Sequence, residues 1–243
     1  MKYNFDFKIQ YEEVDETRNL RLYNLEEYLL NVAGQAADML GFGTFDLLPH
    51  NLTWILAHLS VEMQYLPIHG EEIRIETWIE ENAHMLSRRD YRIYLTKAHD
   101  HELGYIGKAT STWALLDLTS RSIANAFDMP MFDGVVDGEK LEFERAPRLL
   151  PIKEPTGERL HMVSYSDLDY NGHCNSCKYL QAMLNAKRLT IGNRTVRLDI
   201  NYQKEAKEGD AMRTLYLETA DQVQYQQVDA EGKTNCTASI RLL

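Results

Sequence analysis

Residues 165–179 read YSDLDYNGHCNSCKY, and within them Asp169, Asn171 and His173 stand at alternate positions. Alternate residues of an extended segment share one face, so this carboxylate, amide and imidazole would point the same way. An apolar-periodic stretch follows at once, which would bring the three polar groups to the start of a helix. The trio therefore predicts a hydrolytic site. A surface turn leading into a helix N-cap is the alternative interpretation, because Asp and Asn are common turn residues.

Two stretches of the chain have helical periodicity. Residues 24–40 repeat apolar side chains at i, i+3 and i+4, with Asn24 as the expected N-cap and Gly41 after the last turn. The second helix is expected over residues 175–188, directly after the polar trio. Asn175 and Ser176 are expected to cap that helix rather than take part in chemistry.

The remaining periodic segments alternate with period two and predict strands. Four lie in the first half, at residues 55–63, 73–79, 91–95 and 106–118. The second half has an extended start at 160–165 and further strands at 196–202, 215–217, 223–225 and 238–242. Turn-rich separators between them, such as Pro67–Gly70 and Asp229–Gly232, favour antiparallel neighbours.

The two halves share an order of residues. Tyr11–Asn19, before the first helix, aligns with Tyr165–His173, before the second, and Pro67–Glu71 aligns with Ala206–Asp210. This order predicts a duplication, each half being one helix and an antiparallel sheet that curls around it. Periodicity lapses between the halves. The expected division is a first domain at 1–135, a linker at 136–155 and a second domain at 156–243.

Composition excludes several classes of protein. A formal net charge of -11 argues against non-specific binding to nucleic acid, which depends on Lys and Arg. No apolar run is long enough to span a membrane, and the first residues resemble neither a signal nor a transit peptide. Three cysteines in 243 residues do not make a disulfide framework, which suits a reducing compartment. We therefore expect a cytoplasmic protein.

Further segments accompany the polar trio. WILAHLSVEM stands at 54–63, GEEIRIETW at 70–78, RRD at 88–90 and GKATSTW at 107–113. Together with the Asp-x-Asn-x-His-x-Asn run, they resemble the acyl-acyl carrier protein (acyl-ACP) thioesterases, double hot-dog enzymes of plant plastids and many bacteria. The resemblance covers most of both halves. It implies an α+β fold of two tandem hot-dog domains, each a long helix wrapped by an antiparallel β-sheet.

The resemblance also implies the reaction and its residues. The family hydrolyses the thioester between a fatty acyl chain and the phosphopantetheine arm of acyl carrier protein, which terminates fatty acid synthesis, without metal or organic cofactor. Its catalytic residues carry over to Asp169, Asn171, His173 and, after a strand ending in Tyr, Glu205. Plant members have a cysteine directly after that glutamate; Ala206 stands there in this chain, so a thiol mechanism at that position is excluded.

From these residues we expect Glu205 and His173 to activate water, Asn171 to orient substrate or water, and Asp169 to hold its neighbours in place. Which of Glu205 and His173 is the base stays open. Backbone N–H groups near the start of the second helix are expected to meet the oxyanion. Leu66 stands opposite Glu205 in the first half, which therefore lacks the base and is expected to shape the acyl pocket.

Candidate binding residues fall into two groups. The acyl-pocket walls, which could equally be plain core, are Val32, Ala36, Met39, Trp54 and Leu56. Acyl carrier protein is acidic, so it would dock on basic residues, for which the candidates are Arg88, Arg89, Lys187, Arg188, Arg194 and Arg197. Ordinary solvated surface is the alternative for this second group.

Other interpretations remain open. A hot-dog thioesterase acting on acyl-CoA would use the same chemistry, and a non-catalytic module that binds acyl thioesters would not need all four polar residues. Cys174 and Cys177 have the spacing of a redox pair or half a zinc site, but we expect both to pack as small apolar groups. Acyl chain length, and whether the protein forms a homodimer, are not predicted.

Overall fold

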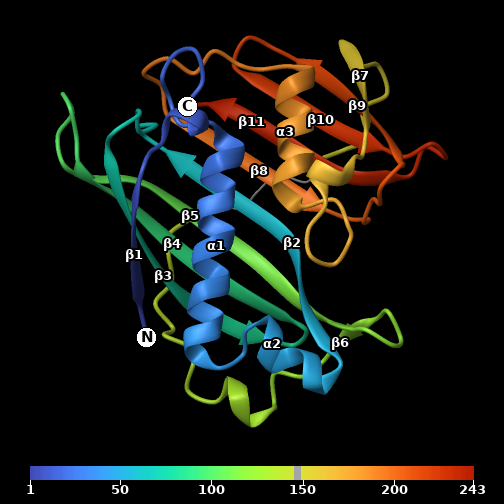
Figure 1. Cartoon of the computed structure of the whole chain (residues 1–243). Helices are drawn as coiled ribbons and strands as arrows, with labels where there is room; N and C mark the ends of the chain where they lie inside the picture. Colours follow the sequence, from blue (N-terminus) through green and yellow to red (C-terminus); the bar gives the residue numbers. More distant parts are fainter. Residues whose placement is uncertain (145–148) are drawn as a thin grey trace. The chain divides into compact units, whose positions relative to one another are not determined.

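The computed structural model describes residues 1–144 and 149–243, which form two compact units (Figure 1). Unit 1 contains Met1–Ala57 and Tyr65–Glu144. Unit 2 contains His58–Gln64 and the described residues from 149 to Leu243. In the described part of the chain, no helix is both long enough and apolar enough to cross a membrane.

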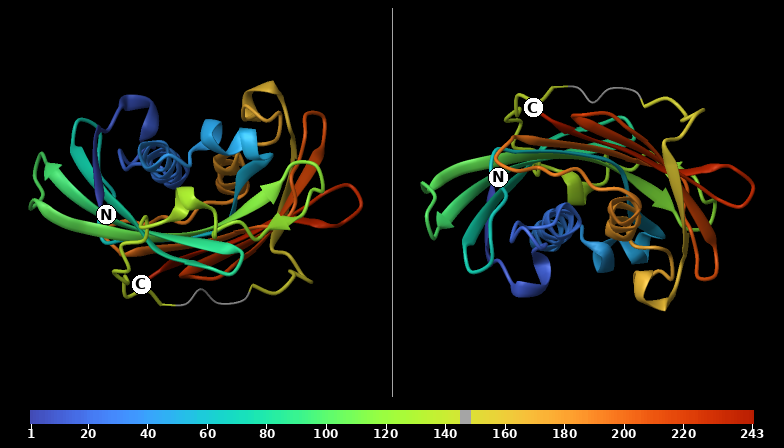
Figure 2. Two further views of the ribbon diagram at one scale, coloured as in Figure 1. Left: turned by 90° about the horizontal axis from the view of Figure 1, so that it is seen from below. Right: turned by 90° about the horizontal axis from the view of Figure 1, so that it is seen from above.

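Unit 1 is a long helix on an antiparallel sheet. The sheet order is β1-β3-β4-β5, with the short β6 on β5. The bounds are β1 Tyr3–Lys8, β3 Glu72–Ala83, β4 Leu86–Lys97, β5 Gly104–Asp117 and β6 Ile123–Ala124. Helix α1, Leu22–Leu40, lies on one face of this sheet (Figure 2). Its buried face carries Leu25, Leu29, Val32 and Ala36, and this apolar burial stabilises the unit.

The ends of α1 differ in how well the sequence predicts them. Gly41 follows the last turn with φ +78°, and its N–H bonds to the carbonyls of the final turn, as expected. The predicted N-cap is wrong. Helix α1 begins at Leu22, and Asn24 lies inside it, where its side-chain amide donates to Glu27 at 2.9 Å. The backbone bond from Leu25 N–H to Arg21 O already closes a turn at 3.0 Å, so the helix needs no cap at Asn24.

Unit 2 repeats the arrangement. Its sheet runs β8-β11-β10-β9-β7, and residues 58–63 of β2, Leu52–Met63, pair antiparallel with β8. The bounds are β7 Gly157–Met162, β8 Val196–Tyr202, β9 Ala211–Glu218, β10 Gln222–Val228 and β11 Thr234–Leu242. Helix α3, Ser176–Ala186, contacts β7, β9 and β10 and lies on one face of the sheet (Figure 2). The predicted turn at Asp229–Gly232 joins β10 to β11.

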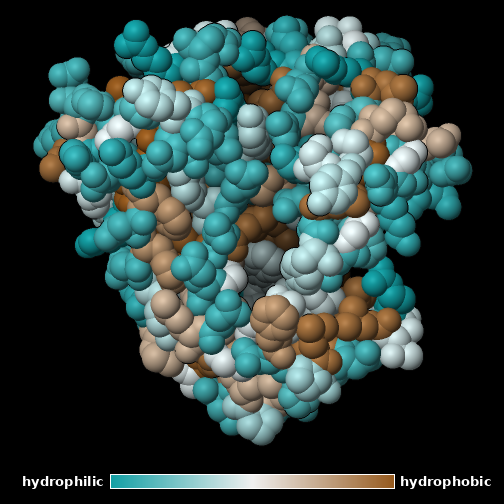
Figure 3. Space-filling model, viewed as in Figure 1, coloured by the Kyte–Doolittle hydropathy of each residue, from teal (hydrophilic) through white to brown (hydrophobic). Residues whose placement is uncertain are grey.

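Short elements complete each unit. Helix α2, Thr44–Leu47, follows α1, and apolar side chains reach the surface around it (Figure 3). The 3-10 turns of the described residues are η1 Tyr11–Glu13, η2 Leu48–His50, η3 Pro130–Phe132 and η4 Tyr165–Asp167. One predicted neighbour relation is corrected. The Pro67–Gly70 turn does not join a hairpin, because β3 pairs with β1 and β4.

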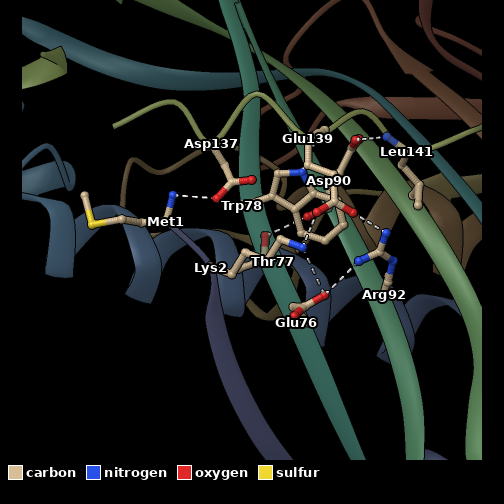
Figure 4. Close-up of polar contacts among 10 residues, drawn as sticks. All are labelled: Met1, Lys2, Glu76, Thr77, Trp78, Asp90, Arg92, Asp137, Glu139 and Leu141. Carbon is tan, nitrogen blue, oxygen red and sulfur yellow. Dashed lines mark hydrogen bonds and ion pairs between the residues drawn. The ribbon is translucent and has the colours of Figure 1, made fainter. Parts of the chain in front are cut away.

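The first part of the predicted linker packs on unit 1 (Figure 4). The indole N–H of Trp78 donates to Glu139 O at 2.7 Å, and Leu141 N–H donates to Asp90 Oδ2 at 3.1 Å. The Glu139 carboxylate also meets Lys2 and Arg92. These bonds fasten residues 137–141 across β3 and β4. Residues 145–148 of the linker lie outside the described residues, and the boundaries at 135 and 156 stay a prediction.

Candidate active site

Asp169 organises the loop that carries the polar trio. Its Oδ1 accepts the backbone N–H of Asn171 at 2.8 Å and of His173 at 3.1 Å. Its own N–H donates to His173 O at 2.8 Å, which closes the loop. Gly172 turns the chain with φ +74°, a conformation that glycine adopts without strain. The loop is therefore held in one shape by backbone bonds to a single carboxylate.

The segment before this loop is anchored by a second carboxylate. Asp167 is buried and accepts the backbone N–H of Ser164 at 2.9 Å, the Ser164 hydroxyl at 3.0 Å and His161 Nε2 at 3.0 Å. Burial by itself would raise the pKa of Asp167. The bonds from Ser164 and the neighbouring His161 outweigh it and hold that pKa below its usual range. Asp167 thus orders the turn.

The structure brings His173 and Glu205 together. His173 Nε2 lies 3.5 Å from Glu205 Oε2, although the two residues are far apart in sequence. Backbone contacts set this approach, because His173 bridges to Lys207 and Cys174 N–H donates to Ala206 O at 2.8 Å. Glu205 lies just beyond the end of β8. The fold thus delivers an imidazole and a carboxylate to one place from two separate segments.

Both groups can reach solvent. The side chains of His173 and Glu205 are 21% and 39% exposed, and Asn171, two residues before His173, is exposed. An imidazole paired with a carboxylate can take a proton from a water molecule and return it to a leaving group. The pair of His173 and Glu205 is therefore within reach of a water molecule, while Asp169 bonds to the backbone of the loop.

The start of α3 is capped as predicted for Asn175. Its Oδ1 accepts Cys177 N–H at 3.0 Å, and its carbonyl accepts Lys178 N–H at 2.9 Å. These two N–H groups are committed to the cap. An oxyanion at this helix start would have to meet other backbone donors.

Unit 1 contains the same loop without the chemistry. Asp15 Oδ1 accepts the N–H of Thr17 at 2.8 Å and of Asn19 at 3.3 Å, and Asp15 N–H donates to Asn19 O at 2.9 Å. The Thr17 hydroxyl donates to Asp15 at 2.6 Å and accepts from the Asn19 amide at 3.0 Å. Where unit 2 has Glu205, unit 1 has the buried Leu66. The duplicated loop keeps its shape but has no acid–base pair.

The five candidate pocket residues lie in unit 1 but differ in environment. Val32 and Ala36 are fully buried on α1. Trp54 is half-buried, donates its indole N–H to Phe42 O at 3.0 Å and packs near Phe132, and Leu56 is also half-buried. Met39 is 62% exposed, because it lies on the outer side of the last turn of α1. Met39 is therefore not part of the apolar interior of unit 1.

Two of the six candidate docking residues are corrected by burial. Arg89 is 4% exposed and donates to the Thr77 hydroxyl at 3.3 Å; burial lowers the pKa of its guanidinium. Arg197 is fully buried and bonds to Asp199 at 2.8 Å. Both point to the interior because their strand positions face covered sides of the sheets. Neither can lie on a docking surface.

The other four candidates reach the surface. Arg88 lies 3.4 Å from Glu80, Lys187 lies 2.8 Å from Glu218 and Arg194 lies 2.5 Å from Asp221. Arg188 is exposed in the segment after α3. Partly exposed ion pairs of this kind contribute little to stability, so their cations can re-pair with a ligand.

The cysteines have no catalytic environment. Cys174, Cys177 and Cys236 are buried, and none of the three is in a disulfide. Burial raises the pKa of the Cys174 thiol to about 12, which keeps it protonated and unreactive. Among the described residues, no cluster of three or more His, Cys, Asp or Glu side chains could hold a metal ion.

Sequence reasoning missed two residues beside the site. The Tyr179 hydroxyl accepts Ala206 N–H at 2.8 Å, and Asn235 O accepts Gln203 N–H and Lys204 N–H at 2.9 and 3.0 Å. Both bond to the backbone around Glu205. Tyr179 was hidden because it fits the apolar periodicity of α3; the signal that reveals it is the alignment of the two halves, which puts Leu25 at its position.

Comparison with known proteins gives two family matches in tandem. Residues 1–129 match the acyl-ACP thioesterase N-terminal domain, and residues 151–242 match the acyl-ACP thioesterase C-terminal domain. A chloroplastic palmitoyl-acyl carrier protein thioesterase of Gossypium hirsutum is 23% identical over 256 residues, which cover 98% of this chain and 59% of the relative. A chloroplastic oleoyl-acyl carrier protein thioesterase of Coriandrum sativum is 24% identical, covering 91% and 64%. The chain thus spans less than two thirds of the length of these relatives.

Solved structures agree with these matches. A crystal structure of an acyl-ACP thioesterase from Bacteroides thetaiotaomicron has a TM-score of 0.86 and 25% identity, covering 100% of this chain and 98% of that chain. A crystal structure of a putative oleoyl thioesterase from Lactobacillus plantarum has a TM-score of 0.82 and 20% identity, covering 100% and 96%. The second likeness shows the fold alone. The expected α+β double hot-dog fold is confirmed.

Proposed function

The chain belongs to the acyl-ACP thioesterase family, and we propose that it hydrolyses the thioester of fatty acyl-acyl carrier protein to free fatty acid and holo-carrier, terminating fatty acid synthesis. The observation that carries the proposal is the pairing of His173 with Glu205 at 3.5 Å in the unit that retains the whole polar motif. A module that only binds acyl thioesters has no need of such a pair.

The proposed reaction uses water as the nucleophile. Glu205 and His173 take a proton from water as its oxygen attacks the thioester carbonyl carbon, and Asn171 orients the water or the substrate. The tetrahedral intermediate carries the negative charge on its oxygen. When this intermediate collapses, the carbon–sulfur bond breaks and the proton returns to the departing thiolate. The products are a fatty acid and the free thiol of the carrier arm.

Oxyanion stabilisation is proposed to come from backbone N–H groups near the start of α3. The helix dipole favours negative charge there. Asn175 occupies the N–H groups of Cys177 and Lys178, so the donors are proposed to lie in the preceding turn. No metal or organic cofactor is part of this proposal, since a carboxylate–imidazole pair suffices to activate water.

Substrate binding is proposed to divide between the units. Unit 1, which lacks the general base, would bind the acyl chain, with Val32, Ala36, Trp54 and Leu56 as candidate walls. The acidic carrier protein would meet the surface cations Arg88, Lys187, Arg188 and Arg194. A reducing cytoplasm is the proposed setting, because three cysteines in 243 residues do not make a disulfide framework. Sedimentation at graded concentrations tests whether the protein forms a homodimer.

The experiment is an assay of thiol release from acyl carrier protein substrates of graded chain length. The protein should hydrolyse at least one of them, and His173→Ala and Glu205→Gln should each reduce kcat by about 10²-fold or more, since each removes one member of the acid–base pair. The same acyl chain on CoA is the comparison. Equal or faster turnover of acyl-CoA would favour the acyl-CoA thioesterase, and binding without thiol release would favour the binding module.

A further inference from the structure

Tyr179 places its hydroxyl against the backbone on both sides of Glu205. It lies in the first turn of α3, is 3% exposed and packs edge-on against Tyr202 with ring centroids 5.9 Å apart. Ala206 N–H donates to the Tyr179 hydroxyl at 2.8 Å, and the hydroxyl donates to Lys204 O at 3.4 Å. These N–H and C=O groups belong to the two peptide units that meet at the Cα atom of Glu205. One side chain therefore restrains both.

The bond to Ala206 has an energetic consequence. Ala206 is fully buried, and a buried backbone N–H without a partner destabilises the fold by about 1–3 kcal/mol. Burial also raises the pKa of Tyr179 above its usual range, so the phenol stays neutral and keeps both its donor and its acceptor. The peptide that follows Glu205 is thus fixed in direction by one buried hydroxyl.

Unit 1 lacks both partners of this bond. Ten residues after Asp15 stands Leu25, whereas ten residues after Asp169 stands Tyr179. In the turn where unit 2 has Ala206, unit 1 has Pro67, whose carbonyl accepts Leu20 N–H at 2.8 Å just as the Ala206 carbonyl accepts Cys174 N–H.

Leucine has no hydroxyl, and proline has no N–H to donate. Unit 1, in which Leu66 stands in place of Glu205, therefore lacks both the N–H donor and the hydroxyl acceptor of this hydrogen bond. The surrounding backbone bonds are the same in both units, so the fold itself does not require the tyrosine. The tyrosine hydroxyl is thus present in the unit that has Glu205 and absent from the unit that has the same loop without it.

We propose that Tyr179 is a positioning residue that orients the backbone of Glu205 so that its carboxylate meets His173. The inference rests on the proposed function, in which Glu205 and His173 activate water. Without the hydroxyl, the peptide groups around Glu205 gain freedom, and the carboxylate spends less time within reach of the imidazole. A misplacement of about 1 Å at such a site can cost about 10²-fold in rate.

The test compares Tyr179→Phe with Tyr225→Phe. Tyr225 is a matched control because it lies in the same unit, is 1% exposed and donates its hydroxyl to a backbone carbonyl, Lys187 O, at 2.7 Å. Tyr179→Phe should lower kcat on acyl carrier protein by about 10- to 100-fold, with KM changed less than about twofold. Tyr225→Phe should keep wild-type kcat. Hydrogen exchange should speed up at the Ala206 amide in Tyr179→Phe alone.

A second variant removes the other partner of the same bond. Ala206→Pro deletes the N–H and reproduces the residue of unit 1, so it should lower kcat in the same way. If both changes act on one bond, the double variant should be no slower than the slower single variant. Multiplying effects would overturn the proposal. This cycle also covers the case in which Tyr179→Phe fails to fold, because Ala206→Pro keeps the tyrosine ring.

Three results separate this proposal from the proposed function. Inactive Glu205→Gln together with impaired Tyr179→Phe supports both. Inactive Glu205→Gln together with wild-type kcat and exchange in Tyr179→Phe overturns the positioning role and leaves the function standing. Full activity of Glu205→Gln overturns both, because there would be no catalytic carboxylate to position.

Discussion

The Oδ1 atom of Asp169 accepts the backbone N–H of His173 at 3.1 Å. The same bond joins Asp15 to Asn19 at 3.3 Å in unit 1, where no imidazole or general base follows. An aspartate that makes the same backbone bonds in both units maintains the shape of the loop. In the proposed mechanism, Asp169 would therefore act on the reaction through the placement of His173.

This role predicts a difference between two substitutions of Asp169. Asparagine retains an oxygen that can accept both N–H groups, whereas alanine leaves both unpaired. Asp169→Asn should thus keep more kcat than Asp169→Ala, by about tenfold or more, because the loss of about 1–3 kcal/mol of loop stability displaces His173. Steady-state kinetics on acyl carrier protein measure the difference. Equal, complete loss in both variants would instead indicate that the charge of Asp169 takes part in the chemistry.

Asp15→Ala is the matched control. It removes the same backbone bonds from the loop of unit 1 and should lower the free energy of unfolding by about 1–3 kcal/mol while leaving kcat within about twofold. Urea unfolding and the same kinetic assay measure both quantities.

The sequence predicted the repeated helix-and-sheet plan because two independent signals agreed on it. Apolar side chains recur at helical spacing through 24–40, and the order of polar and turn residues around Asp15 and Asp169 repeats. It could not predict where α1 begins, because Asn24 and Glu27 look like a capping pair yet bond to each other inside the helix. Local composition cannot distinguish a cap from a pair on the first turn.

The residues alone predicted only those members of the candidate site that lie within the short motif Asp169-x-Asn171-x-His173. Asp169, Asn171 and His173 are visible as neighbours, and Glu205 required a family resemblance because nothing local marks it. Contacts between distant segments decided the rest. Tyr179 looks like a core residue of α3, and Arg197 looks like a surface cation, until the tertiary structure sets one beside Glu205 and buries the other.

The buried pair of Arg197 and Asp199 is predicted to be essential for the stability of unit 2. Both side chains are fully buried, and Asp199 also accepts the Ser60 hydroxyl at 2.6 Å. Asp199→Ala would remove the carboxylate but leave the Arg197 guanidinium buried. It should lower the free energy of unfolding by about 3–5 kcal/mol. Asp221→Ala breaks an exposed pair with Arg194 and should cost no more than about 1 kcal/mol. Chemical denaturation measures both, and similar losses would contradict the prediction.

Asp90 predicts a pH dependence of stability in unit 1. Burial raises the pKa of Asp90 to about 6, against the hydrogen bond from Leu141 N–H that favours the charged form. The folded protein then holds a proton that the unfolded chain releases near 3.8, so this carboxyl stabilises the fold at low pH. That contribution is lost as pH rises toward 6.

Asp90→Asn should remove this dependence while keeping an oxygen for the Leu141 N–H. Relative to wild type, the variant should gain about 1–3 kcal/mol in free energy of unfolding between pH 4 and pH 7. Asp6→Asn is the control of opposite sign, because the hydrogen bond from Arg74 holds the pKa of Asp6 below its usual value. Denaturation curves at several pH values measure the trend. Parallel curves for wild type and Asp90→Asn would show that Asp90 does not titrate in this range.

The surface cations after α3 predict how the carrier protein docks. Lys187 and Arg194 are partly exposed in pairs with Glu218 and Asp221, and an acidic carrier can compete for such cations in water. Changing Lys187, Arg188 and Arg194 together to Glu should raise KM for acyl carrier protein by about tenfold or more at low salt. Hydrolysis of a small acyl thioester should change less than about twofold, because the acid–base site is not altered.

The control for this docking prediction is a second triple variant of equal charge. Lys8, Lys97 and Lys233 are exposed and were not among the docking candidates, so changing them to Glu shifts the net charge by the same amount. If docking depends on the cations after α3, only the first variant should lose carrier affinity, and its deficit should shrink as salt screens the attraction. Equal deficits in the two variants would mean that overall charge, and not this surface, governs the encounter. A loss shared by carrier and small thioester would place the damage in the active site instead.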